Sequence, residues 1–273
     1  MKDKNFLKPL PGAMDLMGIP IHPGSVEVVE AQIKEAVTLK GKSIIANTNI
    51  HCIYLAKKNS QLMDLLQNSR MVVCDGNGPR WGLTILGYSP PPKIPTTRWI
   101  WQLAAFCERK NYRIFLLGGK PGVAADAAQK LGENLPALKA GSHHGFFEKH
   151  GPENEKVIEM INLFKPDVLM VCFGMPVQEQ WIRKNASRVD THVFFMGGGV
   201  LDYVTGRLGK APEWMINFHL EWLFRVYEEP RRLLIRYLVE IPWFFGSVLI
   251  EKFRRIISRQ SRTPQPESSS EKF

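Results

Sequence analysis

Short apolar runs alternate with amphipathic stretches over roughly the first 200 residues. The apolar runs are typical of strands buried on both faces, and they span residues 42–47, 71–74, 113–117, 167–173 and 192–196. Stretches with helical periodicity or composition lie between them, at residues 50–68, 97–110, 123–135, 153–164 and 177–186. This alternation predicts an α/β fold, in which a Rossmann-like parallel sheet carries helices on both faces.

The pattern changes after residue 205. Residues 212–228 and 230–240 are predicted to be helices divided by Pro230, residues 242–249 are strongly apolar, and residues 252–262 are basic. We therefore divide the chain into an α/β domain (1–205), a C-terminal helical appendage (206–262) and a polar tail (263–273) that is expected to be disordered. No uninterrupted apolar run reaches about 18 residues, so a transmembrane helix is not expected.

The net charge of +10 is concentrated near the end of the chain. Between residues 231 and 262 there are eight Lys or Arg residues and two Glu residues. Such a surface suits nucleic acid, anionic lipid or a polyphosphate substrate. Trp243, Phe244 and Phe245 lie among the basic residues, which favours an amphipathic segment in a membrane interface. The alternatives are helices that pack on the domain and expose a solvated basic face, or an RNA-binding tail, although the segment carries no aromatic RNA-binding signature.

Polar side chains follow the first two predicted strands. Because ligands of parallel α/β sheets bind beyond the carboxyl ends of the strands, these positions are candidates for chemistry. Asp75 directly follows a buried strand and is a candidate general base, or alternatively a turn former or helix cap. The amides of Asn47 and Asn49 are candidates to bind sugar hydroxyls or a nucleotide, or alternatively to cap the helix that follows.

Glycines and one glutamine follow the later strands. Gly118 and Gly119 precede a helix, where backbone N–H groups could bind a phosphate, although the string matches neither GxGxxG nor a Walker loop and a tight turn explains it equally well. Gly198 indicates close backbone approach to a ligand or a tight turn. Gln178 lies in the first turn of a predicted helix, where a ligand contact is expected, and Glu179 could complement the helix dipole.

No metal or cofactor site is predicted. The four cysteines lie far apart and form no CxxC pair, which indicates buried thiols rather than a zinc site or a disulfide framework. The chain also contains no Asp-x-Asp string, so no pair of carboxylates is expected to hold a metal ion.

Several strings occur in order along the chain: CDG at 74–76, LLGG at 116–119, FGMPVQEQW at 173–181, EWLFR at 221–225 and EPRR at 229–232. In these strings, and from about residue 16 to residue 238, the chain resembles the WecG/TagA/CpsF family of bacterial glycosyltransferases. The resemblance implies inverting transfer of a sugar, such as N-acetylmannosamine or its uronic acid, from a UDP-sugar to a polyprenyl-diphosphate-linked saccharide. It implies a peripheral enzyme of the cytoplasmic membrane face that needs no metal or cofactor and acts in teichoic acid or surface polysaccharide synthesis.

The resemblance also implies roles for individual residues. It assigns catalysis to Asp75 and an active-site position to Gln178. It implies that arginines near the C-terminus bind the lipid diphosphate, and the matching residues are Arg225, Arg232 and, less closely, Arg236.

Three residues depart from the family pattern. Asn47 stands where the family usually has Thr, and Lys93 and Arg98 stand where it usually has Arg and Asp. These differences leave the sugar and the acceptor open. An inactive family member, or a nucleotide- or nucleic-acid-binding α/β protein without transferase activity, is therefore kept as an alternative. The sequence also leaves the oligomeric state open, with a homo-oligomer as one alternative.

Overall fold

The computed structural model describes residues 5–209, 211–218 and 220–260. Its main sheet has the strand order β4-β3-β8-β7-β5-β6, and every pairing in it is parallel. The strands are β3 (Ser43–Thr48), β4 (Met71–Cys74), β5 (Arg113–Gly118), β6 (Lys139–His143), β7 (Val168–Cys172) and β8 (Val193–Met196). The predicted α/β fold with a parallel sheet is confirmed.

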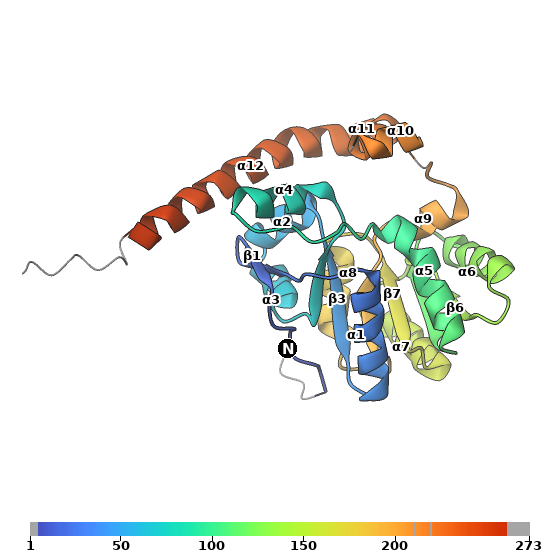
Figure 1. Ribbon diagram of the computed structural model, residues 1–273. Helices are drawn as coiled ribbons and strands as arrows, with labels where there is room; N and C mark the ends of the chain where they lie inside the picture. Colours follow the sequence, from blue (N-terminus) through green and yellow to red (C-terminus); the bar gives the residue numbers. More distant parts are fainter. Residues whose placement is uncertain (1–4, 210, 219, 261–273) are drawn as a thin grey trace, which may run out of the picture.

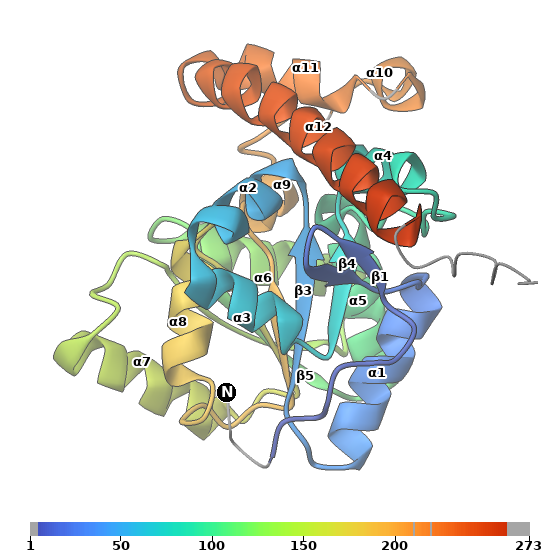
Figure 2. The same ribbon diagram turned by 90° about the vertical axis from the view of Figure 1, so that its left-hand side faces the viewer.

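Helices cover both faces of this sheet. One apolar layer is formed with α2 (Ile50–Lys58), α3 (Ser60–Gln67), α7 (Gly151–Phe164) and α8 (Val177–Asn185). The other is formed with α1 (Val26–Thr38), α5 (Thr96–Arg109), α6 (Val123–Asn134) and α9 (Val200–Thr205). Figure 2 shows α2, α3, α7 and α8 on one side of the sheet and α1 and α5 on the other. The strands are buried from both sides, which explains their continuous apolar runs.

Some elements differ from the sequence prediction. The helix expected over residues 50–68 is two helices, because Asn59 is extended and its side chain accepts hydrogen bonds from the backbone N–H groups of Gln61 and Leu62. A small antiparallel hairpin of β1 (Met14–Leu16) and β2 (Ile19–Ile21) was not predicted. Strand β6 was missed because it pairs only with β5, at the sheet edge, and its half-exposed sequence has no apolar run.

The C-terminal part forms α10 (Glu213–Asn217), α11 (Glu221–Glu228) and α12 (Pro230–Gln260). The predicted division at Pro230 is confirmed, but α12 then continues without a break through Pro242. Figure 1 shows α12 lying across α2 and α4 (Asn77–Ile85). Phe244 and Val248 are fully buried in this contact. A Cβ on Gly82 of α4 would lie 2.7 Å from Phe244 Cζ, so the absence of a side chain at this position leaves room for the Phe244 ring.

One segment of α12 is longer and more apolar than the sequence pattern suggested. Leu233–Ser258 contains an 18-residue window with a mean hydropathy of 1.6, so the segment is long and apolar enough, by length and composition, to cross a membrane. The sequence pattern did not reveal this segment, because isolated charges interrupt its apolar residues. That the chain has no transmembrane helix stays a prediction, because length and composition alone do not make a helix cross a membrane. The tail at 263–273, predicted to be disordered, lies outside the described residues. The domain division at residue 205 stays a prediction.

Candidate active site

The parallel strands end at one common edge of the sheet, and this edge collects the polar residues that follow β3 and β4. Thr48 and Cys74, the last residues of these two strands, are register partners. The pairing extends one residue further, since the backbone N–H of Asp75 donates to the carbonyl of Thr48 at 3.0 Å. Asp75 is thereby held at the carboxyl edge, where ligands of such sheets bind.

The carboxylate of Asp75 is fixed by the start of α5. Its Oδ1 accepts hydrogen bonds from the backbone N–H of Thr96 at 2.8 Å and from the Thr96 hydroxyl at 3.2 Å. The loop before α5 is brought there because the N–H of Ile94 donates to the carbonyl of Cys74 at 2.8 Å. Asp75 is half-buried, so its side chain is positioned by rigid elements and still reaches the surface.

Asn47 belongs to the same network, whereas Asn49 does not. The Nδ2 of Asn47 donates to the Thr96 hydroxyl at 2.8 Å, which gives a chain from Asn47 through Thr96 to Asp75. Among the described residues, the buried Oδ1 of Asn47 has no hydrogen-bond partner. Asn49 instead caps α2, because its Oδ1 accepts from the backbone N–H of Cys52 at 3.0 Å. Of the two alternatives for Asn49, the structure shows helix capping.

The electrostatic environment makes Asp75 a better base than an exposed aspartate. Burial raises the pKa of this carboxyl group above its ordinary value. The two hydrogen bonds from Thr96 and the charges of Arg225 and Lys93 act in the opposite direction without cancelling the rise. Since a proton acceptor works best with a pKa closer to the working pH, this shift suits general-base chemistry.

Two basic residues connect this edge of the sheet to α11. The guanidinium of Arg225 lies 5.3 Å from the ring centroid of Tyr203 in α9, and its charge acts on Asp75. Lys93 donates from Nζ to Glu221 Oε2 at 2.9 Å and so ties the loop before α5 to α11. Arg98 lies nearer the surface, where its Nη2 is 3.9 Å from Glu213 Oε1.

The other predicted arginines lie on α12. Arg236 donates from Nε to Glu240 Oε2 at 3.2 Å. The side chain of Arg232 lies outside the part of the chain that is described.

The glycine-rich turns have packing roles that account for their sequences. Gly118 and Gly119 both have positive φ, and a Cβ on Gly118 would lie 2.3 Å from the carbonyl oxygen of Cys172. The N–H of Gly119 donates to that same carbonyl at 3.4 Å. The N–H of Gly198 donates to Gln178 Oε1 at 3.0 Å. These contacts favour the tight-turn alternative, and a role in phosphate binding stays a prediction.

Gln178 is completely buried, a position that the sequence did not suggest. Besides accepting from Gly198, its amide donates from Nε2 to Glu179 Oε1 at 2.7 Å. Glu179 is 2% exposed, and burial raises its pKa to about 7. Its second oxygen, Oε2, is buried and has no hydrogen-bond partner among the described residues. The pair therefore joins the start of α8 to the loop after β8.

The sequence profile of the glycosyl transferase WecG/TagA/CpsF family matches residues 14–258. The chain belongs to this family. It is therefore a glycosyltransferase, as its motifs predicted.

Curated relatives include the N-acetylglucosaminyldiphosphoundecaprenol N-acetyl-beta-D-mannosaminyltransferases of Staphylococcus aureus strains MRSA252, MW2 and NCTC 8325. Each is 27% identical to this glycosyltransferase over 204 residues, which cover 75% of this chain and 78% of the relative.

Sequence reasoning missed one residue at the centre of this glycosyltransferase's candidate site. Thr96 bonds both Asn47 and Asp75, yet nothing in its local sequence distinguishes it from Thr97. The sequence feature that could have pointed to Thr96 is its place at the start of a predicted helix. Within the described residues, no group of three or more His, Cys, Asp or Glu side chains is placed to hold a metal ion.

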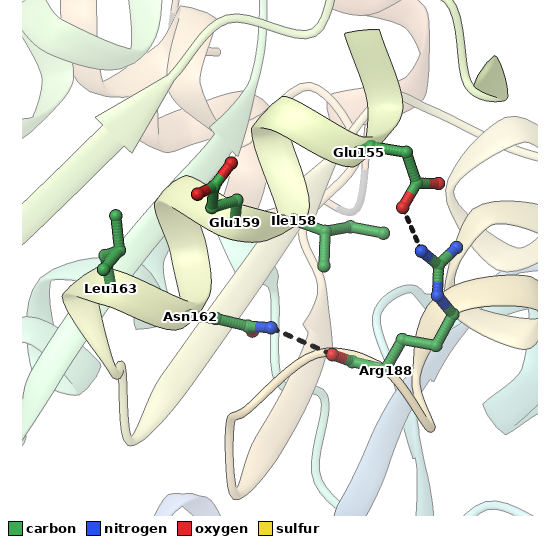
Figure 3. A pocket seen from close by; sticks show the side chains of 6 residues that line it. All are labelled: Glu155, Ile158, Glu159, Asn162, Leu163 and Arg188. Carbon is green, nitrogen blue, oxygen red and sulfur yellow. Dashed lines mark hydrogen bonds and ion pairs between the residues drawn. The ribbon is translucent and has the colours of Figure 1, made fainter. Parts of the chain in front are cut away.

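A surface pocket lies elsewhere on the glycosyltransferase, between α7 and the segment after α8. Figure 3 shows that the guanidinium of Arg188 pairs with Glu155 and that its backbone carbonyl accepts from Asn162 Nδ2 at 3.0 Å. The pocket is also lined by Ile158, Glu159 and Leu163. None of the predicted site residues belongs to it.

Proposed function

We propose that the protein transfers an N-acetylmannosamine-type sugar, its uronic acid or a related hexose from a UDP-sugar to a polyprenyl-diphosphate-linked saccharide. The relatives in Staphylococcus aureus are N-acetylmannosaminyltransferases that act on N-acetylglucosaminyldiphosphoundecaprenol, which supports a mannosaminyl group and an undecaprenyl-diphosphate acceptor. The observation that carries the proposal is Asp75, a half-buried carboxylate with a raised pKa at the carboxyl edge of the sheet. The reaction is a single displacement that inverts the anomeric carbon and uses no metal ion.

In this reaction, Asp75 is the general base. It takes the proton of the acceptor hydroxyl while the hydroxyl oxygen attacks the anomeric carbon of the donor. The bond from that carbon to the UDP oxygen breaks, and UDP leaves with the electron pair. Thr96 and Asn47 position the carboxylate by the bonds described above, so that Oδ1 is held and the group keeps one orientation.

Arginines supply positive charge for the diphosphate groups. The charge of Arg225 acts on Asp75. Arg225 is therefore placed to act also on the UDP that leaves as Asp75 takes the proton. A guanidinium binds a diphosphate through two parallel hydrogen bonds, which fixes the ligand as well as attracting it. We assign this role to Arg225 and, from the family pattern, to Arg232 and Arg236.

The C-terminal helices hold the protein on the cytoplasmic face of an anionic membrane. Large apolar side chains on α10, α11 and α12, and at the C-terminal end of α10, are exposed: Trp214, Phe218, Trp222, Leu223, Tyr227, Leu234, Ile235, Leu238, Val239, Leu249, Ile250, Phe253, Ile256 and Ile257. Exposed Arg231, Lys252 and Arg254 accompany them. Each apolar side chain that enters the interface contributes up to about 1.5–3 kcal/mol, and each basic residue about 1 kcal/mol on anionic lipid.

The packing of α12 favours a helix that lies on the membrane over one that crosses it. Phe244 and Val248 are fully buried and belong to the apolar layer of the α/β domain. Crossing a bilayer would detach these side chains from their contacts. A peripheral position keeps them buried and leaves the opposite face for lipid.

The test is transfer from a panel of UDP-sugars to a synthetic polyprenyl-diphosphate-linked acceptor, with Asp75→Asn beside the wild type. The substitution removes basicity while nearly keeping shape, so we expect kcat to fall by at least about a hundredfold. Asp64→Asn, on the surface of α3, is the matched control and should leave kcat unchanged. Near-wild-type turnover by Asp75→Asn would contradict the proposed mechanism.

A further inference from the structure

A buried carboxylate joins α12 to the α/β domain. Glu240 is 5% exposed, and each of its oxygens has a nitrogen partner. Oε1 lies 2.7 Å from Nδ1 of His51 in α2, and Oε2 accepts from Nε of Arg236 at 3.2 Å. Since an ionised carboxylate only accepts hydrogen bonds, Nδ1 of His51 carries the proton in this contact.

This polar trio stands out because the surrounding helix contact is apolar. Phe244 and Val248 are fully buried, and the rings of Trp243 and Tyr54 pack edge to face at 5.0 Å. A buried ion pair in such a place usually adds no stability over apolar residues of the same volume. Packing of α12 on the domain does not therefore explain why a glutamate stands at position 240. What its carboxylate adds is a fixed orientation of the His51 and Arg236 side chains.

The trio lies at the functional edge of the sheet. His51 is in the first turn of α2, three residues beyond the end of β3, and α12 lies over this helix (Figure 1). On α12, Tyr237 follows Arg236 and packs its ring edge to face on Trp222 of α11, with the ring centroids 6.1 Å apart. Helix α11 also carries Arg225. Arg225 in turn acts on Asp75. Two members of the trio, Arg236 and Glu240, therefore lie on the helix that packs against α11, the helix that carries Arg225.

We propose that Glu240 is a positioning residue that orients Arg236 and His51 as a pair of ligands for a diphosphate. The contact at Nε fixes the plane of the Arg236 guanidinium, and the contact at Nδ1 fixes the ring of His51 and thereby the direction of Nε2. The amino end of α2 adds a favourable field for an anion. This inference rests on the proposed function, and the diphosphate is that of the lipid acceptor or that of the UDP donor.

Two substitutions separate positioning from packing. Glu240→Gln keeps the volume and one acceptor but removes the charge that holds both partners. His51→Asn places an amide N–H near the position of Nδ1, so the tie to Glu240 is kept, and removes Nε2. Glu251→Gln is the matched control, because Glu251 pairs with Arg255 at 2.9 Å with the same four-residue spacing at the other end of α12.

The expected result is a rise of KM with little change of kcat. We expect Glu240→Gln to raise KM for one diphosphate substrate about tenfold, and His51→Asn to raise the same KM about three- to tenfold, with kcat within about twofold. KM is measured separately for the UDP-sugar and for the lipid acceptor, and the constant that moves identifies the source of the diphosphate. Glu251→Gln should leave both values of KM unchanged.

Binding without turnover provides the second measurement. UDP and farnesyl diphosphate are titrated calorimetrically into Asp75→Asn protein, with and without Glu240→Gln. Weaker binding of either probe in the double variant supports the inference. Unchanged KM and unchanged binding in both the Glu240 and His51 variants overturn it, as does a fall of kcat alone. Failure of the proposed function would appear differently, as full turnover by Asp75→Asn.

Discussion

Replacing Thr96 with Val tests whether the hydroxyl at the start of α5 prepares Asp75 for catalysis. The substitution keeps the shape of the side chain and the backbone N–H that donates to Asp75 at 2.8 Å. It removes the hydroxyl that donates to Asp75 at 3.2 Å and accepts from Asn47 at 2.8 Å. One hydrogen bond to the ionised carboxylate is lost, and a buried amide donor loses its partner.

The sign of the effect follows from which form of Asp75 the hydroxyl stabilises. The hydroxyl bonds the ionised form and lowers the pKa, against burial, which raises it. Without the hydroxyl the pKa of Asp75 rises further. A contact as long as 3.2 Å is expected to contribute about 0.7–1.4 kcal/mol, or roughly half a pKa unit to one unit. The unpaired amide of Asn47 should also lower the free energy of unfolding by about 1–3 kcal/mol.

The assay is the pH dependence of kcat/KM with a lipid-linked acceptor. Because the base must be deprotonated, activity is lost as pH falls through the pKa of Asp75, and Thr96→Val should move this acid limb to higher pH. Thr96→Ser restores the hydroxyl and should restore the profile, and Thr97→Val, the adjacent residue, should leave it unchanged. An acid limb that stays in place or moves to lower pH in Thr96→Val would refute the reasoning.

Three further outcomes are expected. Phe244→Ala removes a fully buried ring from the α12 contact and should weaken docking of that helix by about 3–5 kcal/mol, seen as faster hydrogen exchange in α12 with the sheet still protected. Burial raises the pKa of Glu179 to about 7, so the free energy of unfolding should fall as pH rises from about 4.5 to 7. Glu179→Gln should remove roughly 3 kcal/mol of this loss of stability. A free energy of unfolding that stays constant over this pH range in urea titrations of the wild type would contradict the prediction. Leu238→Glu should reduce sedimentation with anionic liposomes, whereas Leu163→Glu should not, because Leu163 is on α7 although it is even more exposed than Leu238. Equal losses of sedimentation would argue against the membrane face.

Much of the fold is readable from the sequence because the central strands are buried from both sides. The runs at 71–74 and 192–196 correspond to β4 and β8 within one residue. Elements that depend on tertiary pairing are not readable in this way. Strand β6 has no apolar run because it lies at the sheet edge, and α12 continues through Pro242 although a proline removes a helix hydrogen bond.

The residues of the candidate site also divide into those that a local sequence pattern predicts and those that depend on tertiary contacts. Asp75 was predicted because a carboxylate directly after a buried strand is a local pattern. Thr96 and Glu240 were not predicted, because their partners are 21 and 189 residues away in the sequence. The burial of Gln178 and Glu179 depends on how α8 packs against the loop after β8, which a helical sequence pattern does not encode.

The central claim is that Asp75 serves as the base for sugar transfer to a polyprenyl-diphosphate-linked saccharide. The most direct test is the mass of the lipid-linked product after incubation with UDP-N-acetylmannosamine and related UDP-sugars. The account predicts an acceptor heavier by one sugar residue with the wild type, and unchanged acceptor with Asp75→Asn over the same time. Equal amounts of extended product from both proteins, or no extended acceptor with any UDP-sugar of the panel, would contradict it.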